Sequence, residues 1–148
     1  IFRTPHWDTI FYDRIKQYPD GIFVAYFYDG NRLWGPNNDE IACVFPLVSR
    51  KWYETLGYFV PEIFAFWAHD TWLQEIGNEL GRCLPIPDAT VEHMTYAYHK
   101  AEFDDTYKRH VHELHKPFVG GHHDVSVLNA NKKMLIEHAN KLRGLMHA

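Results

Sequence analysis

The chain has 148 residues, 46% of them hydrophobic and 16% aromatic, with 15 Lys and Arg against 19 Asp and Glu and a formal charge of −4. A net negative charge does not predict binding to nucleic acid. No apolar run reaches the 18 or so residues that a membrane-spanning helix needs. The length supports one hydrophobic core, so we expect a single domain over residues 1–148. The two cysteines, Cys43 and Cys83, form no CxxC pair and are typical of core residues in a reducing compartment, which predicts a cytoplasmic protein without a disulfide scaffold.

The amino-terminal part alternates between helical and strand-like patterns. Apolar side chains in residues 7–18 recur at helical spacing, and the turn residues 19–21 end that pattern. Aromatic and β-branched residues fill 22–28 and 41–48, which predicts two strands, and Pro46 places an edge, a bulge or a strand end in the second. These patterns favour an α/β fold with a mixed β-sheet flanked by helices.

Two further helices carry signals at their ends. Ser49 is placed to cap a helix over residues 50–56, and Gly57 fits the left-handed position that ends such a helix. Asp70 is likewise placed to cap a helix of about ten residues that ends at Gly81. The apolar stripe of this second helix consists of Leu73, Ile76 and Leu80.

The remaining sequence is more polar. Two extended pieces, 82–86 and 89–94, flank a Pro-Asp turn, and 103–115 predicts a polar helix. Residues 116–148 read as a Gly- and His-rich loop up to 124, followed by an amphipathic helix. The apolar stripe of that helix consists of Leu128, Leu135 and Leu142.

Asp70 has two compatible interpretations. A carboxylate at a helix start caps the exposed N–H groups, and a carboxylate at the lip of a pocket accepts the proton of an attacking hydroxyl group. A capping Asp is rigidly held, which a general base also requires.

Histidines are the other candidates for chemistry. His93 follows an extended segment and is either structural or one ligand of a divalent metal whose other ligands are carboxylates. Seven histidines fall between His93 and His123, including His110, His112 and His115, but no HExxH motif occurs. A solvated polar helix is the simplest interpretation of this region, and an adventitious zinc or nickel site is the alternative.

Several motifs occur in an order that resembles the C-terminal half of a GT-A-type nucleotide-sugar glycosyltransferase, particularly small bacterial, phage and environmental members. The match covers about three quarters of the chain. The motifs are IFRTPHWD at 1–8, YPD at 18–20, FPLVSRKWYETLGYF at 45–59, HDTWL at 69–73, GR at 81–82 and VEHM at 91–94.

This resemblance implies a mixed-sheet fold, a nucleotide-sugar donor and a hydroxyl acceptor. It implies that Asp70 is the base of an inverting transfer and that Mn²⁺ or Mg²⁺ neutralises the leaving diphosphate, with His93 as a candidate ligand. The implied acceptor-binding residues are His69 and four aromatic side chains suited to stacking on sugar rings, Trp34, Tyr58, Phe66 and Trp67.

The family's nucleotide-binding half and its acidic metal motif would precede Ile1, where the chain starts without a methionine. We therefore expect a part of a longer enzyme, or a second chain that supplies the missing half, and negligible transfer by the 148 residues alone. Two alternatives stay open. One is a non-catalytic carbohydrate-binding fragment or pseudo-enzyme, and the other is a metal-dependent hydrolase built on the histidine region.

Overall fold

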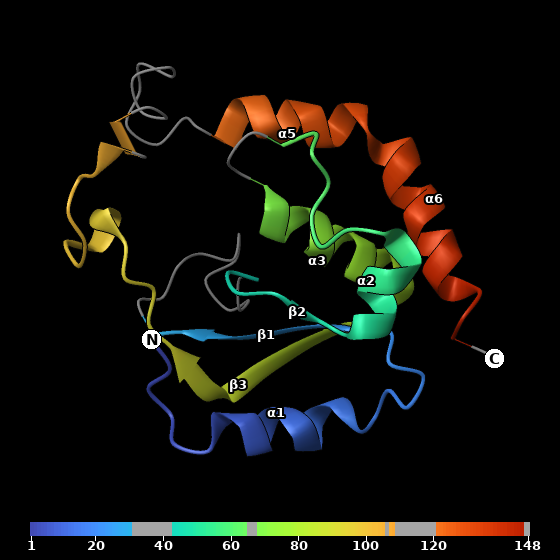
Figure 1. The fold of residues 1–148 in the computed structure, drawn as a ribbon, viewed down its shortest axis with the longest axis horizontal. Helices are drawn as coiled ribbons and strands as arrows, with labels where there is room; N and C mark the ends of the chain where they lie inside the picture. Colours follow the sequence, from blue (N-terminus) through green and yellow to red (C-terminus); the bar gives the residue numbers. More distant parts are fainter. Residues whose placement is uncertain (31–42, 65–67, 106, 109–120, 147–148) are drawn as a thin grey trace.

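A computed structural model describes residues 1–30, 43–64, 68–105, 107–108 and 121–146. The helices are α1 (Trp7–Ile15), α2 (Arg50–Leu56), α3 (His69–Leu80), the 3₁₀ turn η1 (Tyr96–Tyr98), α5 (Gly121–Ala130) and α6 (Lys132–Arg143). The elements form layers: α1 covers one face of a small sheet, α2, α3, α5 and α6 lie on the other face, and the segment that follows the last strand, β3 (Cys83–Val91), extends beyond the end of the strands (Figure 1). Among the described helices, none is both long and apolar enough to cross a membrane.

The sheet has the strand order β2-β1-β3 and is mixed, as the sequence predicts. β1 (Val24–Asp29) is central; it pairs with β3 (Cys83–Val91) in parallel and with β2 (Leu47–Val48) antiparallel. Only the last two residues of the expected strand 41–48 are paired, because Pro46 has no N–H for a ladder; residues 41 and 42 lie outside the described part.

The two extended pieces expected around residues 82–94 are a single strand, β3, and this corrects the prediction of a break at Pro87. The carbonyl of Arg82 accepts a hydrogen bond from Val24 N–H, so Pro85, in the regular part of the ladder, has its missing N–H on the side away from β1. Pro87 lies in the irregular stretch between Ile86 and Thr90, which has no partner residues in β1. Their missing N–H groups therefore cost the ladder nothing. An irregularity in the register between Phe27 and Tyr28 accommodates the extra residues of β3.

The outer edge of β3 is covered near its end by the first residues of the chain. Phe2 forms an antiparallel bridge with Val91, and the backbone of Ile1 exchanges hydrogen bonds with Glu92. Arg3 N–H donates to the carbonyl of Thr90. The amino terminus thus adds a short strand to this edge.

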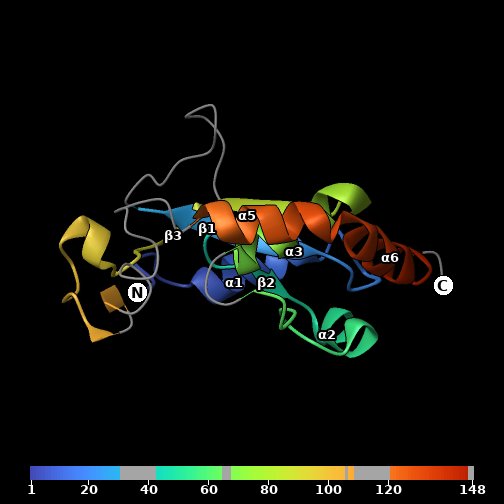
Figure 2. The same cartoon turned by 90° about the horizontal axis from the view of Figure 1, so that it is seen from above.

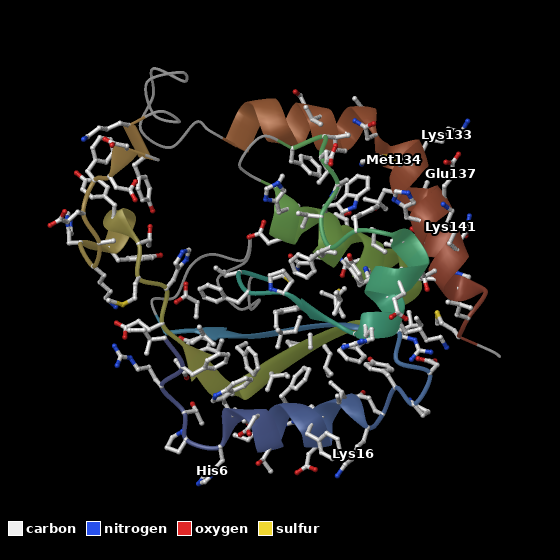
Figure 3. All side chains as sticks on the ribbon, viewed as in Figure 1. His6, Lys16, Lys133, Met134, Glu137 and Lys141 are labelled. Carbon is white, nitrogen blue, oxygen red and sulfur yellow. The ribbon has the colours of Figure 1, made fainter. Side chains whose placement is uncertain are left out.

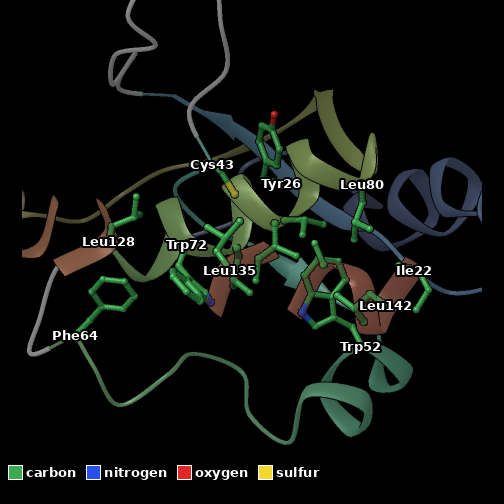
Figure 4. Close-up of a cluster of buried hydrophobic side chains, with 14 residues drawn as sticks. Ile22, Tyr26, Cys43, Trp52, Phe64, Trp72, Leu80, Leu128, Leu135 and Leu142 are labelled. Atoms are coloured by element: carbon green, nitrogen blue, oxygen red, sulfur yellow. The ribbon is translucent and has the colours of Figure 1, made fainter. Parts of the chain in front are cut away.

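Two hydrophobic cores lie on opposite faces of the sheet, where the length of the chain predicts one, because helices on both faces of the sheet divide the buried side chains between its two sides. On one face, α1 contributes partly buried side chains to a core around Phe23, Phe27 and Ile86. On the other face, α2, α3 and α6 pack around fully buried Trp52 and Trp72 (Figure 4). α1 ends at Ile15, three residues earlier than the apolar pattern over residues 7–18 predicts.

The predicted signals for α2 and α3 are confirmed in part. Ser49 Oγ accepts a hydrogen bond from Trp52 N–H and caps α2, while Gly57 ends it with φ of 81°. α3 ends at Gly81 with φ of 64°. Gly77 lies where α3 approaches the sheet, because an added Cβ there would be 2.7 Å from Cys83 Sγ.

The carboxyl-terminal segment contains two helices, where the sequence pattern predicts one. α5 begins at Gly121, within the stretch expected to be a loop, and Asn131 separates it from α6. The inner face of α6 carries Leu135 and Leu142 into the core, whereas Lys133, Glu137 and Lys141 point outward (Figure 3). Figure 2 places α6 at one end of the molecule and the segment that follows β3 at the other.

Candidate functional site

The start of α3 is strained and does not follow the predicted capping pattern. Ala68, not Asp70, occupies the N-cap position, with a left-handed backbone (φ 68°, ψ 8°) and no side chain able to cap. The prediction that Asp70 is the N-cap is therefore wrong. A left-handed Ala costs roughly 1–2 kcal/mol, and such strain is found preferentially at functional sites.

Asp70 lies in the first turn of α3 and lines a pocket of about 270 Å³, which we call the Asp70 pocket. Its described lining is predominantly apolar and comes from three segments: the stretch before β2, the loop after α2 and the start of α3. The lining residues are Val44, Pro46, Phe59, Val60, Ala68, His69 and Asp70.

The Asp70 carboxyl group is held by its neighbour on the helix. The N–H of Thr71 donates to Asp70 Oδ1 at 2.7 Å, and the Thr71 hydroxyl group lies 3.4 Å from the same oxygen. Burial raises the pKa of Asp70 above its ordinary value, and the hydrogen bonds from Thr71 oppose this shift. The Asp70 carboxylate is therefore both held in position and partly removed from water, and these two properties are those of a general base.

The structure separates the other predicted acceptor residues. His69 lines the Asp70 pocket, with its ring 5.9 Å from that of Phe64. Tyr58 is absent from the described lining; its hydroxyl group contacts Trp72 and His138 in the packing between α3 and α6. Its neighbour Phe59 lines the pocket instead.

His93 belongs to a different part of the sheet. It follows β3 at the carboxyl edge of the two parallel strands, and its N–H points to Oδ1 of the buried Asp29 at 3.5 Å. Its ring lies 5.0 Å from the ring of Phe45. The described lining of the Asp70 pocket does not include His93, although Val44 and Pro46, on either side of Phe45, belong to it.

The expected metal centre has no counterpart in the described part of the chain. No group of three or more His, Cys, Asp or Glu side chains gathers there in a way that could hold an ion. His93 and Asp29 alone do not make the oxygen-rich set that Mn²⁺ or Mg²⁺ prefers. Six predicted residues lie outside the described residues: Trp34, Phe66, Trp67, His110, His112 and His115.

Sequence reasoning also missed two residues that the structure places beside predicted site residues, Phe59 near Asp70 and Asp29 near His93. Phe59 is exposed although it is large and apolar, and it lines both this pocket and a second one beside α2. Asp29 ends β1 just where His93 follows β3, and parallel pairing could have predicted that juxtaposition.

Both cysteines are free, as predicted. Cys43 is buried, and burial raises the pKa of both thiols, that of Cys83 to about 11. Neither thiol is therefore activated as a nucleophile.

Comparisons of the chain with protein-family models, with curated proteins and with solved structures found no match, so the geometry and chemistry of the site carry the functional assignment.

Proposed function

We propose that this chain is the acceptor-binding, base-bearing part of a GT-A-type glycosyltransferase that uses a nucleotide-sugar donor. The observation that carries the proposal is Asp70, a desolvated carboxylate in the first turn of a helix, at the wall of an apolar pocket. The order of the sequence motifs and the mixed sheet are compatible with it.

In the proposed reaction, Asp70 removes the proton from an acceptor hydroxyl group. The acceptor oxygen attacks the anomeric carbon of the donor sugar. The bond between that carbon and the diphosphate oxygen breaks, and its electron pair leaves with the nucleoside diphosphate. Thr71 donates its hydrogen bonds to Asp70 Oδ1, so we assign Oδ2 as the oxygen that receives the proton. The raised pKa brings the carboxyl group closer to the operating pH, which favours proton transfer.

The proposal includes a dependence on Mn²⁺ or Mg²⁺, but the described residues do not provide the ligands. We therefore derive no step through a metal ion, and the chemistry assigned to this chain is acceptor binding and proton removal.

The test is a donor-consumption assay on the product of the complete reading frame, with a panel of nucleoside diphosphate sugars and with or without EDTA. Asp70→Asn is expected to lower kcat at least 100-fold with little change in the KM of the donor, because a base acts in the transition state. The matched control is Asp13→Asn on α1, across the sheet from the pocket.

An Asp70→Asn enzyme with unchanged kcat would rule out the proposal. Binding of sugars without any consumption of donor would assign the chain to the alternative class, a carbohydrate-binding module.

A further inference from the structure

The Asp70 pocket shares the side chain of Phe59 with a second pocket beside α2, which we call the Tyr53 pocket. The Tyr53 pocket has a volume of about 350 Å³, and its described lining comes from the end of β2, from α2 and from the loop after it. Phe59 lines both pockets, so the two adjoin at its side chain. Taken together, the two pockets span the surface from Asp70 to α2, and we call this surface the groove.

One wall of this groove is the segment that leads into β2. Phe45 and Leu47 pack on the α1 side of the sheet, whereas Val44, Pro46 and Val48 line the groove. This alternation is that of a mostly extended backbone. Leu47 and Val48 form β2, and the chain bends at residues 44 and 45, so this wall reaches at most about 13 Å, four steps of about 3.3 Å.

The groove exposes aromatic rings that the fold leaves uncovered. Phe59 is 43% exposed and Tyr53 is 50% exposed, although both lie next to a core that buries Trp52 completely. An exposed ring presents an apolar face, and the C–H face of a sugar packs on such a surface. Tyr53 is therefore positioned to contact a ligand that extends past Phe59.

Polar groups accompany these rings in the Tyr53 pocket. Arg50 and Glu54 lie one turn apart on α2, and Ser49 lies at its start. A guanidinium group donates hydrogen bonds and a carboxylate accepts them, which suits a ligand rich in hydroxyl groups. Because the described lining of the two pockets carries one Lys or Arg side chain, Arg50, and two carboxylates, Glu54 and Asp70, it does not favour a polyanion such as nucleic acid.

From these observations we infer that the groove binds an oligosaccharide acceptor of at least two sugar units. The unit that reacts lies beside Asp70, the next unit packs on Phe59, and the chain continues over Tyr53 towards Arg50 and Glu54. This inference rests on the proposed function for the role of Asp70, and it adds the class of acceptor and the residues that select for its length.

The experiment is an NMR titration of the 148-residue chain with cello-, malto- and chito-oligosaccharides of one to four units. In at least one series, the Kd should fall tenfold or more between one and three units, with amide shifts in residues 44–48 and 50–54. Tyr53→Ala should weaken binding of the trisaccharide at least fivefold and leave binding of the monosaccharide unchanged; Phe59→Ala should weaken both. Tyr12→Ala, an exposed tyrosine on α1, is the matched control and should change neither.

The inference is overturned if no series binds with shifts in these segments, if the Kd is independent of length, or if Tyr53→Ala binds all lengths like the wild type. These outcomes are separable from failure of the proposed function. Length-dependent binding together with an unaffected Asp70→Asn enzyme retains the oligosaccharide groove and removes the base. Loss of turnover in Asp70→Asn together with length-independent binding retains Asp70 as the base and removes the oligosaccharide groove.

Discussion

The hydroxyl oxygen of Tyr58 lies 2.5 Å from Nδ1 of His138, and this contact joins the loop after α2 to α6. Trp72 on α3 donates its indole N–H to the same oxygen at 3.3 Å. An indole nitrogen can only donate, so the Tyr58 oxygen accepts from Trp72 and keeps its own proton available for Nδ1 of a neutral His138. The Tyr58 hydroxyl group therefore links the side chains of Trp72 and His138.

This arrangement makes the docking of α6 sensitive to pH. Burial lowers the pKa of His138, Lys141 lowers it further, and Glu137 opposes the shift. Below the ordinary His pKa of about 6.5 the unfolded chain therefore binds the proton more readily than the folded chain. We expect the free energy of unfolding to be at its full value above about pH 7 and to decrease as the pH falls below 6.5.

Urea titrations between pH 5 and 8 measure this effect. His138→Gln should show a smaller loss of stability on acidification than the wild type, whereas His6→Asn, at an exposed position outside the core, should retain the wild-type slope. Equal slopes in wild type and His138→Gln would show that this histidine does not contribute.

We expect the buried carboxylate of Asp70 to lower the stability of the folded chain although the proposed activity requires it. Its raised pKa means that the ionised form is disfavoured in the folded chain, so the cost appears as the pH rises through the titration. Asn retains an oxygen that can accept the hydrogen bond from Thr71. We expect Asp70→Asn to raise the free energy of unfolding by about 0.5–1 kcal/mol at pH 7.5, as is common when a functional carboxylate is removed.

Chemical denaturation at two pH values checks this prediction. The advantage of Asp70→Asn should be smaller near pH 4 than at pH 7.5, because a larger fraction of the wild-type carboxyl group is then neutral. The exposed Asp13→Asn should remain within about 0.5 kcal/mol of the wild type at both values. A destabilised Asp70→Asn at pH 7.5 would contradict the argument.

Gly77 should tolerate no side chain. A Cβ at this position would lie 2.7 Å from Cys83 Sγ and 3.2 Å from Val24 Cγ2, so α3 would have to move away from the sheet. Overpacking of this kind costs about 1–3 kcal/mol, which exceeds the gain of about 1 kcal/mol in helix propensity. Thermal unfolding should show a lower Tm for Gly77→Ala. Gly144→Ala, where the nearest atom would be 3.5 Å away, should leave the Tm unchanged or slightly raised.

Arg82 should stabilise the turn that precedes β1. Its Nη2 lies 2.8 Å from Asp20 Oδ2, its guanidinium group lies 4.6 Å from the centroid of the Tyr18 ring, and the two charged side chains are only 16% and 11% exposed. Removal of one partner leaves a poorly solvated charge, so we expect Arg82→Gln to cost about 2–3 kcal/mol in urea denaturation.

The ion pair between Arg14 and Asp88 is the matched control, because its side chains are about half exposed. Arg14→Gln should cost less than about 1 kcal/mol. Asp20→Asn combined with Arg82→Gln should recover part of the loss, since no unpaired charge then remains. Equal costs for Arg82→Gln and Arg14→Gln would contradict the interpretation.

The elements predicted best are those set by local signals. The cap at Ser49 and the left-handed Gly57 and Gly81 specify the ends of α2 and α3 within a few residues of sequence. Local signals do not show whether the prolines at 85 and 87 interrupt β3. Whether a proline interrupts a strand depends on which side of the strand the neighbour pairs, and that is a tertiary property.

The site was predicted only in part for the same reason. A carboxylate at a helix start is visible in the sequence, so the place of Asp70 in the first turn of α3 could be predicted, but the prediction that it caps the helix is wrong because Ala68 takes the cap position. The sequence does not show which of the two neighbouring side chains, Tyr58 or Phe59, lines the pocket. Both follow Gly57 in an irregular loop without a period, and only the packing of α6 turns Tyr58 inward and leaves Phe59 in the groove.

The closed edge of β3 determines where this sheet can grow. Pro85 offers no N–H on that side, and the outward groups of Thr90 and Glu92 are already bonded to the first residues of the chain. Among the described residues, a further strand would therefore find hydrogen-bonding partners on the other side, next to β2 or beside the residues of β1 beyond Ala25, where β2 does not reach. Any polypeptide that extends the sheet, whether from the same protein or from another, is directed to the side where the segment lining the groove lies.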